Sequence, residues 1–198
     1  MKIVEYRGIE GLVYAPITED STENFTAGDV KELAGVAELT KSTESSSEAH
    51  YYDNMPAVVI ESTGSDEVTA SVSAIPLDVL ADITGQTYDE TTNMFIEGPR
   101  ENKYFALGYR TKKTDGTEVY VWRLKGTFSI PESTHNTEDD GTDANGQEIT
   151  YTGISTTHKF TKTGKGAKAI NVEADGKADV STFFETVQIP DSVKAKAV

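Results

Sequence analysis

Hydrophobic and polar residues alternate along much of this chain, which is the pattern of strands with one buried face. The alternation is strict over Val68–Ala74 and longest over residues 104–130. Asp115-Gly116 interrupts the longer segment and is a dipeptide typical of hairpin turns. The sequence therefore predicts a long hairpin, whose second strand places one set of apolar residues on a single face: Tyr120, Trp122, Leu124, Phe128 and Ile130.

Shorter apolar segments predict further strands. The run Ala57–Ser62 is typical of a buried strand, and Thr63-Gly64-Ser65 is expected to turn it into the strand over Val68–Ala74. The remaining predicted strands are Gly11–Ala15, Leu33–Lys41, residues 87–97, residues 149–160, and one or two within residues 170–189.

One segment changes from the strand period to the helical one. Leu77, Leu80 and Ala81 fall on one side of a helix over Pro76–Gly85. Proline suits the start of a helix, an acid such as Asp78 suits its first turn, and glycine suits its end. A single short helix is expected here.

Composition agrees with a mainly β fold. The chain has 26 Thr, 16 Val and 12 Ile against 7 Leu, and residues branched at Cβ favour strands over helices. We expect a single domain over residues 1–198, with no linker that divides it. Its irregular parts are expected to be an N-terminal arm over residues 1–30, a long polar loop over residues 42–56 and a flexible C-terminal tail over residues 190–198.

Charge and cysteine content exclude several classes of protein. The 18 Lys and Arg against 33 Asp and Glu give a net charge of −15, which disfavours a conventional basic DNA-binding surface. The absence of cysteine excludes disulfides, thiolate zinc sites and a cysteine nucleophile. No apolar run has the roughly 18 residues of a membrane span, and the start of the chain lacks the apolar core of a signal peptide. We expect a protein that folds in the cytoplasm without contact to membranes.

No motif predicts catalysis, a cofactor or a metal. The acidic segment Asp139–Glu148 resembles a calcium loop, but Gly141 and Thr152 occupy positions that require carboxylates. The three histidines are far apart in sequence, and no Gly-x-Ser-x-Gly nucleophile motif is present. Trp122 could stack on a sugar, but its apolar neighbours at period two favour a place in the core. The protein is therefore not expected to be an enzyme.

Basic residues gather in two segments of an otherwise acidic chain, residues 100–125 and residues 159–168. Such a distribution favours head-to-tail assembly, in which a cationic patch of one copy contacts an anionic patch of the next. The candidates for these contacts are Arg110, Lys112, Lys113, Lys162 and Lys165.

The order of these parts resembles a known family. The parts that carry the resemblance are, in order, a short strand at Gly11–Pro16, Leu33–Lys41 leading into a polar loop with Tyr51-Tyr52-Asp53-Asn54, the Ala57–Ala74 hairpin, the helix at Pro76–Gln86, the hairpin over Tyr104–Pro131 and the closing Thr182–Val187. This order is similar to that of the major tail tube proteins of long non-contractile bacteriophages, specifically the phi13-type family. The resemblance extends over nearly the whole chain and depends on order and spacing, not on one motif.

This resemblance implies a two-sheet β-sandwich or rolled barrel flanked by one short helix. It further implies hexameric rings that stack into a tube around a tape-measure protein and later conduct double-stranded DNA. Tail tip and tail terminator proteins would be further partners. The chain would be found in the virion tail, and in the host cytoplasm during assembly.

If the chain forms such a tube, two groups of residues are candidates for specific contacts. Tyr51, Tyr52 and Asp53 are expected to reach the adjacent ring, because paired aromatic residues in a polar segment suit the centre of an interface. A second group, Glu38, Glu61 and Asp89, lies on polar faces of predicted strands and could line the lumen or face outward.

Two alternatives come from other classes. A carbohydrate-binding or adhesin-like β-sandwich would stay monomeric and bind glycans through an exposed Trp122. A hydrolase with an acidic site would need a deep pocket holding two carboxylates whose pKa values differ.

Overall fold

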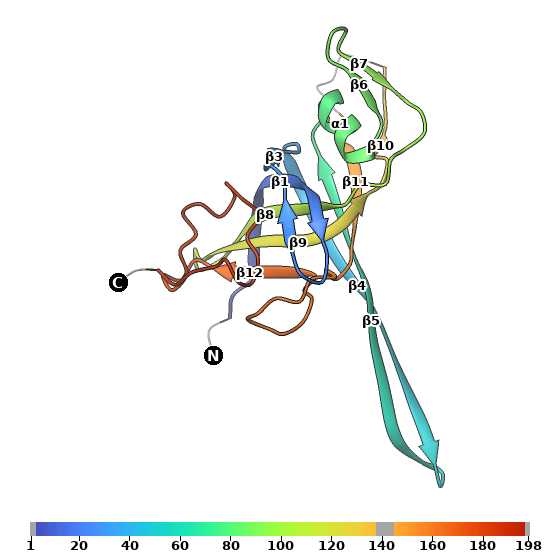
Figure 1. Ribbon diagram of the computed structural model, residues 1–198, viewed down its shortest axis with the longest axis vertical. Coiled ribbons are helices and arrows are strands. Elements are labelled where there is room, and N and C mark those ends of the chain that lie inside the picture. The colour runs from blue at the N-terminus through green and yellow to red at the C-terminus, as the bar shows by residue number, and fades with distance from the viewer. Residues whose placement is uncertain (1–2, 138–144, 197–198) are drawn as a thin grey trace.

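The computed structural model describes residues 3–137 and 145–196, which form a mainly β protein with one short helix (Figure 1). The elements are β1 (Tyr6–Asp20), β2 (Phe25–Ala27), β3 (Lys31–Glu32), β4 (Val36–Tyr52), β5 (Met55–Val72), α1 (Leu77–Thr84), β6 (Thr87–Asp89), β7 (Met94–Ile96), β8 (Phe105–Lys113), β9 (Glu118–Phe128), β10 (Glu132–Ser133), β11 (Gln147–Gly153) and β12 (Ala169–Glu173). Within the described residues, ten strands form one antiparallel sheet along the path β2-β1-β8-β9-β11-β5-β4. Strand β3 pairs with β1, β10 with β11 and β12 with β9, while β6 and β7 form a separate pair. The prediction of a mainly β fold with a single helix is confirmed.

The hairpin predicted over residues 104–130 is the pair β8–β9. Gly116 has φ 90° in its turn, a conformation that favours glycine. Both faces of β9 are covered, because Val119 and Val121 belong to one hydrophobic cluster while Trp122 and Leu124 belong to a second on the opposite face. Strands buried on both faces lose the simple apolar and polar alternation.

The predicted single face of β9 is wrong in its last two members. Phe128 packs in the cluster of Val119 and Val121, and Ile130 is 57% exposed. The pairing with β8 shifts between Phe105 and Leu107, opposite Gly126 and Arg123, so β9 contains one extra residue there. A bulge of this kind moves the following side chains to the other face.

Helix α1 lies where it was predicted. Pro76 precedes it, and Gly85, with φ 67°, ends it by donating its backbone N–H to the carbonyl of Asp82. The buried side differs by part of a turn from the predicted one, since Ala81 and Ile83 are buried while Leu77 is 49% exposed.

The predicted polar loop over residues 42–56 is part of a β-hairpin, with register shifts between Thr43 and Ser45 and between His50 and Tyr51. Strands β4 and β5 pair from Val36 with Val72 to Tyr52 with Met55, and no turn occurs at residues 63–65. The reversal lies at Asp53-Asn54, where φ is 51° and 62°, as the tightest two-residue hairpin turns require. The predicted N-terminal arm is also largely regular, because β1 starts at Tyr6 and continues to Asp20.

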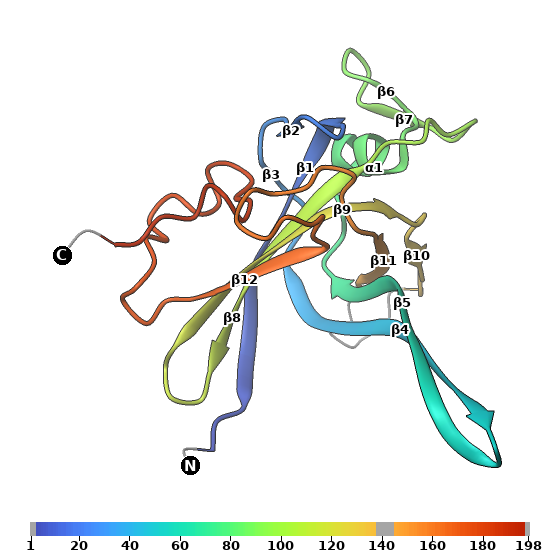
Figure 2. The same cartoon turned by 60° about the horizontal axis from the view of Figure 1, so that its bottom comes forward.

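The large sheet rolls up without closing. Leu12 and Leu107 from one half share a core with Val68 and Ile149 from the other half, so the two halves face each other. In the described part of the chain, β4 is the last strand of its path and has no ladder with β1. Figure 2 shows β1 and β8 running to one side and the β4–β5 hairpin to the other.

Strand β12 is one of the one or two strands predicted within residues 170–189, and the residues after it cover the second face of β8–β9 with turns. Phe183 is buried, and Ala178 pairs with Ala195 in an isolated bridge. The Asp191 carboxylate accepts the backbone N–H groups of Thr161 and Lys162, each at 2.8 Å. Residues 190–196, predicted as a flexible tail, are therefore held against the body.

Candidate interaction site

A two-stranded hairpin extends far beyond the body of the protein (Figure 1). We define the projecting hairpin as residues 44–64, every one of which is exposed. At about 3.3 Å per residue, the nine residues from Glu44 to Tyr52 span roughly 30 Å. An isolated two-stranded hairpin has marginal stability in water, so a ribbon of this length gains stability when another surface covers it.

The tip of the projecting hairpin carries large apolar side chains. Tyr51 and Tyr52 are both 65% exposed, and Asp53 lies in the turn beside them. The segment predicted as a buried strand also lies here, because Val58, Val59 and Ile60 are about half exposed. Exposed apolar patches of this kind mark interaction sites in soluble proteins. The sequence indicated the tyrosines, but it gave no sign that the valines and the isoleucine lie in solvent.

A buried ionic network fixes the base of the projecting hairpin. The Asp66 carboxylate accepts hydrogen bonds from Thr43 Oγ1 at 2.9 Å and from Arg123 Nη1 at 2.7 Å. Lys168 lies 3.3 Å from the same carboxylate and donates to the carbonyl of Gly64. These residues come from β4, β5, β9 and the segment before β12, so the network joins the hairpin to the body. Their spacing in the sequence gave no signal, because the contacts are long-range.

The network predicts a loss of stability in acid. Burial raises the pKa of Asp66, but the Thr43 hydrogen bond and the charges of Arg123 and Lys168 outweigh it and lower the pKa below its ordinary value. A lowered folded-state pKa stabilises the fold above about pH 4 and loses this contribution as the pH falls through it. We expect the Tm, followed by circular dichroism, to drop in that range.

The Asp66→Asn variant tests whether the ionic network causes this loss of stability in acid. It leaves Arg123 buried without a carboxylate and is expected to cost about 3–5 kcal/mol at neutral pH, while flattening the decline in acid. An unchanged Tm at neutral pH together with an unchanged acid profile would show that the network contributes nothing.

The three lumen candidates lie in different parts of the subunit. Glu38 is at the base of β4, Glu61 is on the projecting hairpin, and Asp89 is in the β6–β7 hairpin at the opposite end of the long axis (Figure 1). The carboxylate of Asp89 accepts hydrogen bonds from Thr92 Oγ1 at 2.6 Å and from the backbone N–H of Thr91 at 2.9 Å, which lower its pKa. One subunit therefore does not bring the three together on one surface.

The basic candidates divide into two groups. Arg110 pairs with Glu10 at 2.8 Å, and Lys113 pairs with Glu173, so both have partners within the chain. The other three, Lys112, Lys162 and Lys165, are exposed. Nζ of Lys162 donates to the carbonyl of Pro190 at 3.2 Å, and no ion pair involves Lys112 or Lys165 among the described residues.

Trp122 belongs to the core. Its side chain is fully buried, and Nε1 donates a hydrogen bond to the carbonyl of Phe183 at 2.9 Å. The exposed tryptophan that a glycan-binding surface would use is therefore not available at this position.

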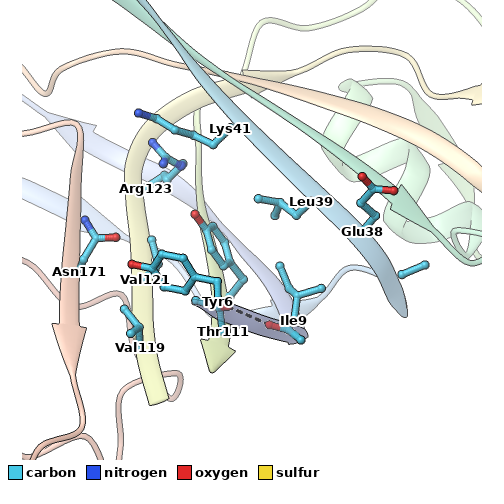
Figure 3. A pocket seen from close by; sticks show the side chains of 13 residues that line it. Tyr6, Ile9, Glu38, Leu39, Lys41, Thr111, Val119, Val121, Arg123 and Asn171 are labelled. Atoms are coloured by element: carbon cyan, nitrogen blue, oxygen red, sulfur yellow. Dashed lines mark hydrogen bonds between the residues drawn. The ribbon is translucent and has the colours of Figure 1, made fainter. Parts of the chain in front are cut away.

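A hollow of about 660 Å³ lies between β1 and β4, beside the base of the projecting hairpin (Figure 3). Ile9 and Leu39 contribute partly buried apolar surface, and Tyr6 stands at 70% exposure. Lys41 and Arg123 lie on one side of the hollow and Glu38 on the other (Figure 3). Glu38 is its sole lining carboxylate among the described residues, whereas acid–base hydrolysis of glycosides uses a pair.

The chain was compared with family models and with curated protein sequences. No family model matches the chain, and no curated protein matches its sequence. In the described part of the chain, no group of three or more His, Asp or Glu could hold a metal ion, and no helix is long and apolar enough to cross a membrane. The calcium-like segment of the sequence lies mostly in residues 138–144, outside the described residues.

Proposed function

We propose that this chain is the subunit of a self-assembling tube, a major tail tube protein of the phi13-type class. In this proposal six copies form a ring, rings stack around a tape-measure protein, and double-stranded DNA later passes through the lumen. Tail tip and tail terminator proteins would close the two ends. The rolled sheet with its facing halves would be the two-sheet sandwich of that class.

The main support for the proposal is the exposure of the projecting hairpin. Its residues are exposed on both faces, and its tip combines two tyrosines with aliphatic side chains about half exposed. A ribbon of roughly 30 Å with apolar side chains in solvent is typical of a surface that another molecule covers. A second copy of the chain would cover it and remove its apolar surface from water.

Free strand edges support the same function. Strand β4 ends the path of the large sheet, so its outer edge offers unpaired backbone groups from Val36 to Tyr52 in the described structure. Proteins that stay monomeric usually protect such edges, whereas a subunit can add its neighbour's strand to them.

The charge of the chain is compatible with a conduit for DNA. Six chains at −15 each carry −90 formal charges. A wall of the same sign as the phosphates does not retain DNA, because electrostatic attraction supplies most of non-specific binding to nucleic acid.

Electron microscopy tests the proposal directly. We expect the purified protein, alone or with a tape-measure partner, to form rings and tubes of uniform diameter. A protein that remains monomeric at all concentrations and binds glycans would contradict the proposal and favour the carbohydrate-binding alternative.

Charge reversal at Lys112 tests the basic contacts. Lys112→Glu is expected to raise the protein concentration required for assembly up to about fivefold, because exposed ion pairs contribute about 0.2–1 kcal/mol each. The Tm should fall only slightly, since Lys112 is exposed and outside the core, and the new carboxylate opposite Glu118 costs at most about 1 kcal/mol. Light scattering at several salt concentrations provides the measurement.

Lys177→Glu is the matched control for that experiment. It changes the net charge equally but lies outside both basic segments and pairs with Asp175. Assembly of the Lys112→Glu protein that equals wild type at every salt concentration would remove Lys112 from the interface.

A further inference from the structure

We infer that the hollow between β1 and β4 receives the tip of the projecting hairpin of a second copy, with Glu48 of that copy facing Lys41 and Arg123. This inference rests on the proposed self-assembly and names the two surfaces that meet. In each copy the hollow lies at the base of the projecting hairpin, and the segment that fills it is the tip of the projecting hairpin of another copy.

Arg123 and Lys41 both line the hollow and both act on the Asp66 carboxylate, and Arg123 retains one N–H group without an acceptor. The Arg123 side chain is almost fully buried, and its Nε has no hydrogen-bond partner among the described residues. Buried N–H groups on charged side chains are costly when they lack an acceptor. Lys41 is exposed and forms no ion pair in the described part of the chain. Both lie on the same side of the hollow, with Asn171 beside them (Figure 3).

The projecting hairpin has the complementary charge. It contains four acids, Glu44, Glu48, Asp53 and Glu61, and neither Lys nor Arg. Glu44 already accepts a hydrogen bond from Ser65 Oγ near the base. The other three carboxylates are exposed.

The strand register selects Glu48 from these acids. Glu48 pairs with Ile60 and His50 pairs with Val58, so these four side chains share one face of the hairpin. Glu61 lies on the opposite face, where its partner is Ser47. The Glu48 face therefore combines one carboxylate with two aliphatic side chains.

The hollow offers the matching arrangement. Ile9 and Leu39 are partly buried and present apolar surface, and Lys41 lies two residues from Leu39 on the same face of β4. Val58 and Ile60 of the second copy would cover Ile9 and Leu39 while Glu48 meets the cations. Desolvation by these contacts would strengthen the charge interaction.

Cysteine cross-linking tests this pairing, because the natural chain contains no cysteine. Val58→Cys chains are mixed with Leu39→Cys chains, assembled and oxidised, so that every disulfide joins two copies. We expect a cross-linked dimer band much stronger than the band that either chain gives alone. Val59→Cys, on the opposite face of the hairpin, is the matched control and is expected to give at least tenfold less. Ile9→Cys replaces Leu39→Cys if the latter fails to fold.

Charge exchange provides the second readout. Lys41→Glu is expected to lower the cross-link yield about tenfold, and Glu48→Lys in the same chain is expected to restore it. Glu61→Lys in place of Glu48→Lys should not restore it, because that side chain lies on the other face.

The outcomes separate this inference from the proposed function. Cross-links in rings or tubes support both, whereas cross-links in a closed dimer that does not grow support the pairing and overturn the tube. Rings or tubes without a cross-link between residues 58 and 39, or 58 and 9, overturn the pairing and leave the tube standing. A protein that never associates overturns both.

Discussion

A chain without its projecting hairpin is expected to fold normally and to form no tubes. Ser45 and Thr63 are directly opposite each other, so residues 46–62 can be replaced by Asn-Gly, which favours the two-residue turn required between them. Every residue removed is exposed, and the change in unfolding free energy should therefore stay within about 0.5 kcal/mol. Assembly should disappear because the apolar tip is lost.

Electron microscopy and light scattering measure the loss, and circular dichroism confirms the fold. A full-length chain with Ser46→Thr and Ser62→Thr is the control, since it alters one exposed cross-strand pair and keeps the tip. Tubes of normal length from the shortened chain would exclude any role of the hairpin in assembly.

The second large effect is a loss of stability when Trp122 is substituted. Trp122→Ala should lower the free energy of unfolding by about 3–5 kcal/mol, the usual cost of deleting a fully buried aromatic side chain. It removes ring contacts with Phe184 and leaves the carbonyl of Phe183 without its donor. Denaturant unfolding gives the measurement.

Two further variants, Trp122→Phe and Ile130→Ala, serve as controls for the stability change of Trp122→Ala. The first keeps much of the volume and should cost less than Trp122→Ala, while the second truncates an exposed side chain and should change stability by no more than about 0.5 kcal/mol. A Trp122→Ala protein as stable as wild type would contradict the place of Trp122 in the core and reopen the glycan-binding alternative.

Local signals predicted the elements that depend on local chemistry. Helix α1 was found from Pro76, its apolar period and Gly85, and the β8–β9 hairpin from alternation around Asp115-Gly116. Each of these signals lies within one element and needs no knowledge of the rest of the fold. The position of Trp122 in the core also followed, because its neighbours at period two are apolar.

The elements that were missed depend on distant contacts. Residues 42–56 are polar and were expected to be irregular, yet the ladder with β5 makes them a strand. The apolar run Val58–Ile60 has the composition of a buried strand, and no local signal shows that the sheet ends before it. The extra residue in β9 near Gly126 was equally invisible, since a bulge is defined by its partner strand.

The candidate site was predicted in part for the same reason. Tyr51 and Tyr52 drew attention by their composition, and they lie at the tip of the projecting hairpin. Asp66 and Arg123 are 57 positions apart in the chain, so their contact could be learned only from the folded structure.

Strands β4 and β5 continue from the core to the tip of the projecting hairpin, with a register shift between Thr43 and Ser45 at its base. The projecting hairpin is therefore an extension of the large sheet, and in the described structure no separate linker joins it to the body. A load applied at Tyr52 has to bend the same two strands that carry Val68 and Val72 in the core. In the proposed stack of subunits, bending of one hairpin would therefore reach the core of its own subunit, and the filament would respond as an elastic rod.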